Sequence, residues 1–240
     1  MSVEKPMTKE NIDSCLAAVA RQFRKLAGKS MPAEITLIGG ASILINYGFR
    51  DSTYDIDALI HASDAMKEAI NYVRDQMNLP VGWLNDDFKR TRSYSPKLVN
   101  YSKYYKTFSN VLQVRTITGE YLVAMKLMAY RKYKHDISDI VGILTAQKEK
   151  GEPLSFELID KAVHDLYGGW QDMPEHAEEL IHSILAQDDL KKLYQTYADE
   201  ESASKDVLVD FEGEYPDVLK EDNLEEILAS LRRKIEKEKT

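Results

Sequence analysis

The chain has 240 residues, of which 43% are hydrophobic and 30% charged, and its formal net charge is −8. This length and apolar fraction predict one or two globular domains with a sizeable core, and they exclude a disordered or fibrous chain. The single cysteine excludes a disulfide framework and a Cys-based zinc site. The excess of acids argues against a protein that coats duplex DNA, because phosphate neutralisation needs surplus Lys and Arg.

The N-terminal residues MSVEKPMTKENID are polar and acidic, without the apolar segment that is typical of a signal peptide. No later run reaches the roughly 18 apolar residues that a membrane-spanning helix needs. We therefore expect a soluble, cytoplasmic protein without a membrane partner.

The first half of the chain predicts alternating helices and strands. Apolar residues at helical spacing predict the helices, whereas short β-branched runs predict the strands. In chain order we expect a helix at 8–28, a strand at 34–38, a helix at 41–47, a strand at 54–60, a helix at 63–77, a loop-rich stretch at 80–96 and a strand at 111–117.

The second half predicts helices joined by short turns, so the fold class expected is α+β, with a small mixed β-sheet core followed by an all-α half. We place domain boundaries at 1–119 for the core, 120–198 for the helical domain and 199–240 for an acidic arm. The expected helices are 120–133, 136–149, 155–167, 175–187, 189–198 and 223–239; residues 199–222 are predicted to be a linker or loosely packed arm, with one strand candidate at 207–211.

Charge is distributed unevenly along the sequence. Residues 199–240 contain fourteen acids and seven bases, which leaves residues 1–198 at a net charge of −1. Residues 88–119 contain seven bases and no acid, interleaved with tyrosines. Such a composition stacks bases and follows phosphates in single-stranded RNA, and its alternative is a solvated edge whose tyrosine rings pack on the body. The stretch is the best candidate for an acceptor or nucleotide surface.

The most informative residues lie between 35 and 60. A strand delivers Gly39-Gly40 to the start of a helix, and Ser42 follows. Two glycines allow a phosphate to approach the backbone, and the free N–H groups at a helix start favour an anion. Asp55 and Asp57 come on the next strand, where a spacing of two puts both carboxylates on one face, about 7 Å apart at Cα. Paired carboxylates suit Mg²⁺ when substrate phosphates supply its other oxygens.

Each part of this motif has a purely structural alternative. A Gly-Gly pair after a strand is common in turns, and Ser42 could cap the helix. An Asp-Ile-Asp segment is often the solvated face of an amphipathic strand. The combination of phosphate turn and carboxylate pair, in this order and within 19 residues, is far more specific than either part.

On these residues the sequence resembles the nucleotidyltransferase superfamily with the polymerase-β-like palm. That family has a Gly-Gly or Gly-Ser turn, a helix, and then Asp-x-Asp on the adjoining strand, which Gly39, Gly40, Ser42, Asp55 and Asp57 match. Arg50 and Thr53 are similar to the Arg/Thr residues that often precede the acid pair, at a different spacing. The segment LVAMKLMAYRKYKHDISDIV at 122–141 resembles the Lys-x₄-Arg…Asp-x-x-Asp stretch of AbiEii-like abortive-infection toxins and related bacterial nucleotidyltransferases.

The resemblance implies a role for each matching residue. Asp55 and Asp57 would be catalytic and would ligate Mg²⁺ or Mn²⁺; the residues implied in nucleotide binding are Gly39, Gly40, Ser42, Arg50, Thr53 and Lys126. The alternative for Lys126 is a solvated helix position. Asp136 and Asp139 form a capping arrangement on one interpretation. On another, Asp139 orients Lys126 or Arg131, and we expect Arg131 to pair with one of these acids.

The sequence departs from the family at the third carboxylate. Active members usually carry a further acid on a later strand, and the natural place here is 111–117, where Gln113 stands. An amide cannot act as a base and is a weak metal ligand. Asp86 and Asp87 are candidate substitutes, although a turn or helix cap explains them more simply.

Three functions remain open from the sequence. The first is Mg²⁺-dependent transfer of an NMP group from an NTP to a hydroxyl on RNA or protein, as part of a toxin–antitoxin or phage-defence system. The second is a catalytically impaired module of the same fold, acting as an antitoxin or regulatory partner, with the acidic C-terminal arm docking to a protein. The third is transfer to a cationic small molecule, against which the basic 88–119 stretch argues.

Overall fold

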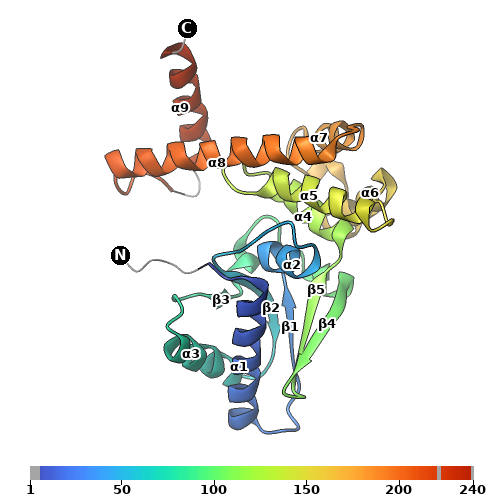
Figure 1. Cartoon of the computed structure of the whole chain (residues 1–240), viewed down its shortest axis with the longest axis vertical. Coiled ribbons are helices and arrows are strands. Elements are labelled where there is room, and N and C mark those ends of the chain that lie inside the picture. Colours follow the sequence, from blue (N-terminus) through green and yellow to red (C-terminus); the bar gives the residue numbers. More distant parts are fainter. Residues whose placement is uncertain (1–5, 221–222, 239–240) are drawn as a thin grey trace.

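A sheet-containing half and a helical half make up the molecule. The computed structural model describes residues 6–220 and 223–238. Figure 1 shows the sheet in one half and most of the later helices gathered against one end of it. This arrangement confirms the predicted α+β class, with a mixed sheet first and helices afterwards.

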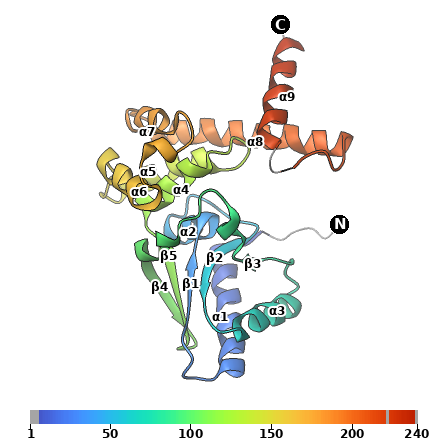
Figure 2. The same cartoon turned by 180° about the vertical axis from the view of Figure 1, so that it is seen from behind.

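The sheet has five strands in the order β3-β2-β1-β5-β4, which can be followed in Figure 2. The central strand β1 pairs antiparallel with β2 and parallel with β5, so the sheet is mixed. β3 adds to β2 in parallel, and β4 forms an antiparallel hairpin with β5. The strands are β1 (Ala33–Leu37), β2 (Ile56–His61), β3 (Leu84–Asn85), β4 (Ser102–Phe108) and β5 (Leu112–Ile117).

Two amphipathic helices cover one face of the sheet. α1 (Lys9–Ala27) and α3 (Ala65–Met77) pack against each other and bury their apolar stripes against alternate strand residues. Thr8 caps α1 through its side chain, and Gly28 ends the helix at a φ of +91°. Both boundaries agree with the capping signals that the sequence carries.

The helical half begins directly after β5. α4 (Gly119–Ala129) and α5 (Asp136–Glu149) are apolar on most sides and form the centre of a second core. α6 packs on α4, α7 contacts α6 and α8 lies along α5, whereas α9 contacts α8 and projects away from the body. These helices are α6 (Phe156–Tyr167), α7 (Ala177–Leu185), α8 (Leu190–Glu214) and α9 (Leu224–Glu238), with α2 (Gly39–Asn46) joining β1 to β2 in the first half.

The C-terminal arm differs from its prediction. The expected linker at 199–222 is helical as far as Glu214, and its residues 221–222 lie outside the described range. The strand candidate at 207–211 was wrong, because this segment lies within α8. The apolar run Val207–Val209 favoured a strand when read locally. The buried residues of this helix are Glu201, Ser204 and Leu208, which are spaced by three and four and so share one helical face. The expected boundary at 198 therefore falls inside a continuous helix.

The two edge strands of the sheet escaped prediction. β4 has the sequence SKYYKTF, with little apolar content, and β3 has only two residues. Both are edge strands, whose apolar signal is weak because one face and one edge are open to water. Across the described residues, no helix is long and apolar enough to cross a membrane.

Candidate active site

The acid pair lies at the start of β2. Asp57 is the second residue of this strand, and the amide N of Ile38 donates to its backbone oxygen at 2.9 Å. Asp55 lies in the bend just before the strand and is exposed, so only one of the two carboxylates belongs to the strand. The expectation that both stand on one strand face is therefore corrected, although the pair stays adjacent.

The Gly39-Gly40 turn faces Asp57. Gly39 has a φ of +52°, which favours glycine, and a Cβ at this position would lie 3.9 Å from Asp57 Oδ2. α2 begins at Gly39, its N-cap is Ile38, and no side chain caps it. The first N–H groups of a helix have no intrahelical partner, so the backbone here can donate to an anion beside the acid pair.

Arg50 and Thr53 close the other side of the turn. A Cβ on Gly40 would lie 2.9 Å from Arg50 Nη1 and 2.9 Å from Thr53 Oγ1, so only glycine fits without displacing them. Thr53 Oγ1 donates to the backbone oxygen of Asp55 at 3.2 Å. The structure therefore gathers the turn, the acid pair, Arg50 and Thr53 in one place.

Ser42 points elsewhere. Its side chain is fully buried, and its Oγ accepts a hydrogen bond from the backbone N–H of Ile117 at 3.0 Å. This bond ties α2 to the end of β5. The Ser42 side chain therefore lies inside the core, away from the predicted phosphate site, and it does not cap α2.

The surroundings of Asp57 disfavour the charged form of its carboxylate. Burial and the neighbouring Asp55 raise the pKa of Asp57 to about 6, against the opposing influence of Lys134, Arg131 and Lys126. Lys134 was not a candidate in the sequence; the cation-rich run Arg131–Lys134 was the signal that could have revealed it.

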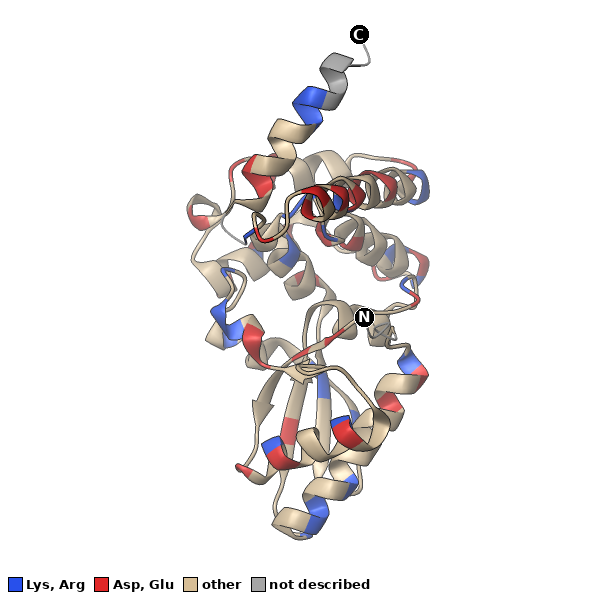
Figure 3. Cartoon of the chain, turned by 90° about the vertical axis from the view of Figure 1, so that its left-hand side faces the viewer, with Lys and Arg blue, Asp and Glu red and all other residues tan. Residues whose placement is uncertain are grey.

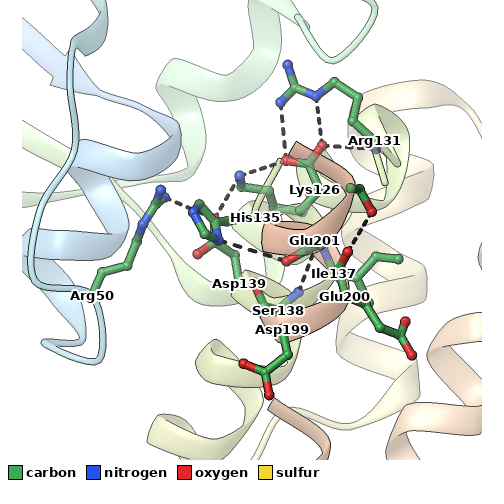
Figure 4. Close-up of polar contacts among 12 residues, drawn as sticks. Arg50, Lys126, Arg131, His135, Ile137, Ser138, Asp139, Asp199, Glu200 and Glu201 are labelled. Atoms are coloured by element: carbon green, nitrogen blue, oxygen red, sulfur yellow. Dashed lines mark hydrogen bonds and ion pairs between the residues drawn. The ribbon is translucent and has the colours of Figure 1, made fainter. Parts of the chain in front are cut away.

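A buried ion-pair cluster lies next to this site (Figure 4). Lys126 Nζ is 2.8 Å from Asp136 Oδ1 and 2.8 Å from Asp139 Oδ2, and the lysine side chain is only 11% exposed. Arg131 Nε lies 2.8 Å from Asp136 Oδ2, and Arg50 Nη1 lies 3.1 Å from Asp139 Oδ2. The two acids therefore bind three cations that come from three different segments.

These contacts decide between the interpretations of the two acids. The N-cap of α5 is His135 and no side-chain capping bond is made there, so the predicted capping arrangement of Asp136 and Asp139 was wrong. Asp139 pairs with Lys126 and Arg131 pairs with Asp136, as the alternative interpretation expected. Burial opposes ionisation of Asp136, but Lys126 and Arg131 outweigh it and hold the pKa of this carboxyl well below its usual range.

Gln113 stands far from the acid pair. It pairs in register with Glu34, and its Nε2 donates to Glu34 Oε2 at 3.1 Å. Asp57 is opposite Ile38, which directly follows β1 and lies four positions beyond Glu34, roughly 13 Å away at the rise of a strand. Gln113 is therefore too distant from Asp57 to contact the same metal ion.

The strand next to Asp57 on the other side is β3, and Asn85 is its register partner. Asn85 Nδ2 donates to the backbone oxygen of Gly82 at 2.9 Å, and its Oδ1 accepts from the amide N of Asp87 at 2.8 Å. Asp86 is 54% exposed and pairs with Lys89 at 2.7 Å. The residue that flanks Asp57 on β3 is therefore the amide Asn85, and the acids Asp86 and Asp87 follow it directly in the sequence.

The basic stretch 88–119 is largely engaged with the protein itself. Tyr101 stacks on Tyr121 with ring centroids 3.8 Å apart, and Tyr105 donates to Asp13 at 2.8 Å. Lys106 Nζ lies 2.8 Å from Asp13 Oδ2, and Arg115 bonds Ser102. Figure 3 shows Lys and Arg residues on both halves of the molecule. The packed-edge alternative accounts for these residues; Tyr104 remains exposed.

The residues present suit a divalent cation with only two protein carboxylates. Among the described residues no group of three or more His, Cys, Asp or Glu is arranged to hold a metal ion. The charge of Asp55 raises the pKa of the neighbouring Asp57, and a cation bound between the two carboxylates would relieve this repulsion. Mg²⁺ is commonly bound by one or two carboxylates plus substrate phosphates, and that pattern fits this pair.

Comparison with known proteins adds one match. A family model described as "Nucleotidyltransferase of unknown function (DUF6036)" matches residues 14–212. The matched span includes the glycine turn, the acid pair, the ion-pair cluster and nearly all of α8. No curated protein and no solved structure matches the chain. The narrower resemblance to AbiEii-like toxins finds no support in these comparisons.

Proposed function

Because this chain belongs to the DUF6036 family of nucleotidyltransferases of unknown function, we propose that it transfers an NMP group from an NTP to a hydroxyl on RNA or protein, with Mg²⁺ or Mn²⁺ as cofactor. One observation carries the proposal: Gly39, at the uncapped start of α2, lies against the carboxylate of Asp57. Backbone N–H groups suited to a phosphate and a pair of carboxylates suited to a divalent cation therefore share one site.

Each side chain has a role that follows from its surroundings. The backbone N–H groups at Gly39 and Gly40 would bind phosphate oxygens. Arg50 stands beside Gly40, and Arg131 and Lys134 interact electrostatically with Asp57, so these three cations would offset the charge of a triphosphate. Asp55 and Asp57 would hold the metal ion, which when bound supplies charge stabilisation at the phosphates.

Lys126 supports the site indirectly. Because its Nζ is already bound by Asp136 and Asp139, it fixes the two acids that orient Arg131 and Arg50. We therefore assign Lys126 a positioning role, in place of the direct neutralisation of the triphosphate that the family resemblance implied. The catalytic demand on the protein is then mainly placement of charge and of reacting groups.

The reaction itself is a single displacement at phosphorus. The oxygen of the acceptor hydroxyl forms a bond to the α-phosphorus, and the bond from that phosphorus to the bridging oxygen of the β-phosphate breaks. Pyrophosphate leaves, and the hydroxyl proton passes to water. Tight positioning of the triphosphate on the glycine turn would align the attacking and leaving oxygens.

The test is label transfer from each of the four α-³²P NTPs, with Mg²⁺ and cell extract. We expect transfer by the wild type and at least about a hundredfold loss in Asp55→Asn/Asp57→Asn. Asp64→Asn, an exposed acid on the same core, is the matched control. Sensitivity of the labelled product to nuclease or to protease separates an RNA acceptor from a protein acceptor. Equal transfer by wild type and the double variant would refute the proposal.

A second candidate is a nucleotide-binding module without turnover. Asn85 favours it, because the register partner of Asp57 on β3 carries an amide in place of a third acid. Titration calorimetry with the four Mg²⁺–NTP complexes distinguishes the two candidates. Binding without label transfer supports the module, and the absence of nucleotide binding contradicts both.

A further inference from the structure

Glu201 is a buried carboxylate that belongs to the C-terminal helix α8. The residue is only 3% exposed. Its Oε1 accepts hydrogen bonds from two backbone N–H groups, those of Ile137 at 2.8 Å and of Ser138 at 3.4 Å (Figure 4). Its partners therefore lie more than sixty residues away, in the first turn of α5.

The first turn of α5 depends on this distant carboxylate. The N–H groups at the start of a helix have no intrahelical acceptor, and a residue at the N-cap usually supplies one. Here the N-cap is His135, which makes no side-chain capping bond. Glu201 therefore supplies, from α8, the hydrogen-bond acceptor that an N-cap side chain supplies in other helices.

The same turn holds the acids of the ion-pair cluster. Asp136 and Asp139 flank Ile137 and Ser138, so the backbone that Glu201 fixes also sets the direction of both carboxylates. Those carboxylates in turn hold Arg131 and Arg50, which stand beside the acid pair and the glycine turn.

We propose that Glu201 is a positioning residue of the nucleotide site, which fixes the first turn of α5 and thereby the cations that receive the triphosphate. The inference rests on the proposed function, because it assigns a task to the same site. It also makes α8 part of the functional unit, and removal of this helix would leave two helix N–H groups of α5 without their acceptor.

The surroundings of the two Glu201 carboxylate oxygens determine which substitutions test this role. Glu201 Oε2 is buried without a hydrogen-bond partner, and His135 Nδ1 lies 3.9 Å from it. Glutamine keeps the accepting Oε1 and should serve as the conservative replacement. Alanine removes the acceptor, and aspartate moves it away from α5 because its side chain is one methylene group shorter. Glu200→Ala is the matched control, because Glu200 is the exposed neighbour on the same helix.

The experiment combines two measurements on the full chain. Amide hydrogen exchange at Ile137 and Ser138 is measured without nucleotide, and binding and turnover of the four Mg²⁺–NTP complexes are measured separately. In Glu201→Ala we expect exchange at both amides to rise roughly fivefold to tenfold, with a similar rise in KM or Kd and a smaller change in kcat. Glu201→Gln restores most of both, and Glu200→Ala resembles the wild type.

Every outcome decides the inference. Unchanged NTP affinity in a folded Glu201→Ala chain overturns it, and so does a loss that Glu201→Gln fails to restore. If Glu201→Ala does not fold, Glu201→Asp takes its place, and wild-type affinity in that variant also overturns the inference. A wild type that binds none of the four nucleotides refutes the proposed function instead, while the exchange measurement still tests whether Glu201 fixes α5.

Discussion

Arg50 Nη1 lies 3.1 Å from Asp139 Oδ2, although 89 positions separate the two residues in the sequence. Arg50 comes from the loop between α2 and β2, and Asp139 from the first turn of α5. The pair therefore joins the sheet-containing half to the helical half directly beside the Gly40 turn. A cation beside the glycine turn is thus held in place by a carboxylate of the other half.

Removal of one member of the ion-pair cluster should destabilise the protein strongly. Asp136→Asn leaves Lys126 and Arg131 without their shared partner in a site where Asp136 is fully buried. We expect a loss of about 3 kcal/mol in the free energy of unfolding, measured by urea denaturation. Asp86→Asn removes an exposed pair with Lys89 and should cost less than about 1 kcal/mol. Equal losses in the two variants would contradict this account.

The glycine turn should not tolerate a methyl group at Gly40. In Gly40→Ala the Cβ would displace Arg50 Nη1 and Thr53 Oγ1. We expect roughly tenfold weaker binding of Mg²⁺–NTP and a loss of about 1–3 kcal/mol in stability. Gly213→Ala is the control, because nothing lies within 4 Å of its Cβ in α8. That change should raise helix stability by about 0.5–1 kcal/mol and leave binding unaltered.

Ser42→Ala separates a structural role from a binding role. The substitution removes the acceptor of the buried Ile117 N–H. We expect a loss of about 1–3 kcal/mol in thermal or urea denaturation and a change in NTP affinity of less than about twofold. A strong loss of affinity without loss of stability would instead return Ser42 to the phosphate site. Ser63→Ala, at an exposed position, is the matched control.

The charge on Glu201 should make stability depend on pH. Burial raises the pKa of Glu201 to about 7, despite its hydrogen bonds with α5; Asp139 adds to the rise, and His135 lies 3.9 Å away. Because the unfolded chain releases this proton near pH 4.5 and the folded chain near pH 7, stability falls as pH rises through that window. Measured by urea denaturation from pH 4 to 8, Glu201→Gln should become more stable than wild type by about 1–3 kcal/mol above pH 7.

The comparison with Glu201→Gln isolates this one group, because all other titratable groups are the same in the two proteins. Below pH 4.5 the neutral Glu201 of the wild type and the glutamine should give similar stabilities. A stability difference that stays constant from pH 4 to 8 would show that Glu201 does not titrate in this window.

Local pattern predicted most elements of the first half and missed those whose stability comes from contacts. α1, α3, β1 and β5 carry helical or alternating apolar patterns, and the sequence placed each of them within a few residues. β4 is polar on its open face, so its pairing with β5 had no apolar signal. The run at 207–211 looked like a strand, but contact with α5 selected a helix there.

The sequence by itself determined the class of the molecule and the parts of its site that are close together in the chain. Gly39, Gly40, Asp55 and Asp57 lie within one short segment, and they meet once the neighbouring strands β1 and β2 pair. The family match agrees with that motif.

Only the tertiary structure decided which distant groups share the site. Register moved Gln113 away from Asp57 and brought Asn85 beside it, because pairing depends on neighbouring strands that local patterns do not specify. Packing of α8 on α5 likewise brought Glu201 to the start of α5, where a buried carboxylate persists because two backbone N–H groups bind it. Long-range partners of this kind are set by the fold as a whole, since each residue alone is compatible with many surroundings.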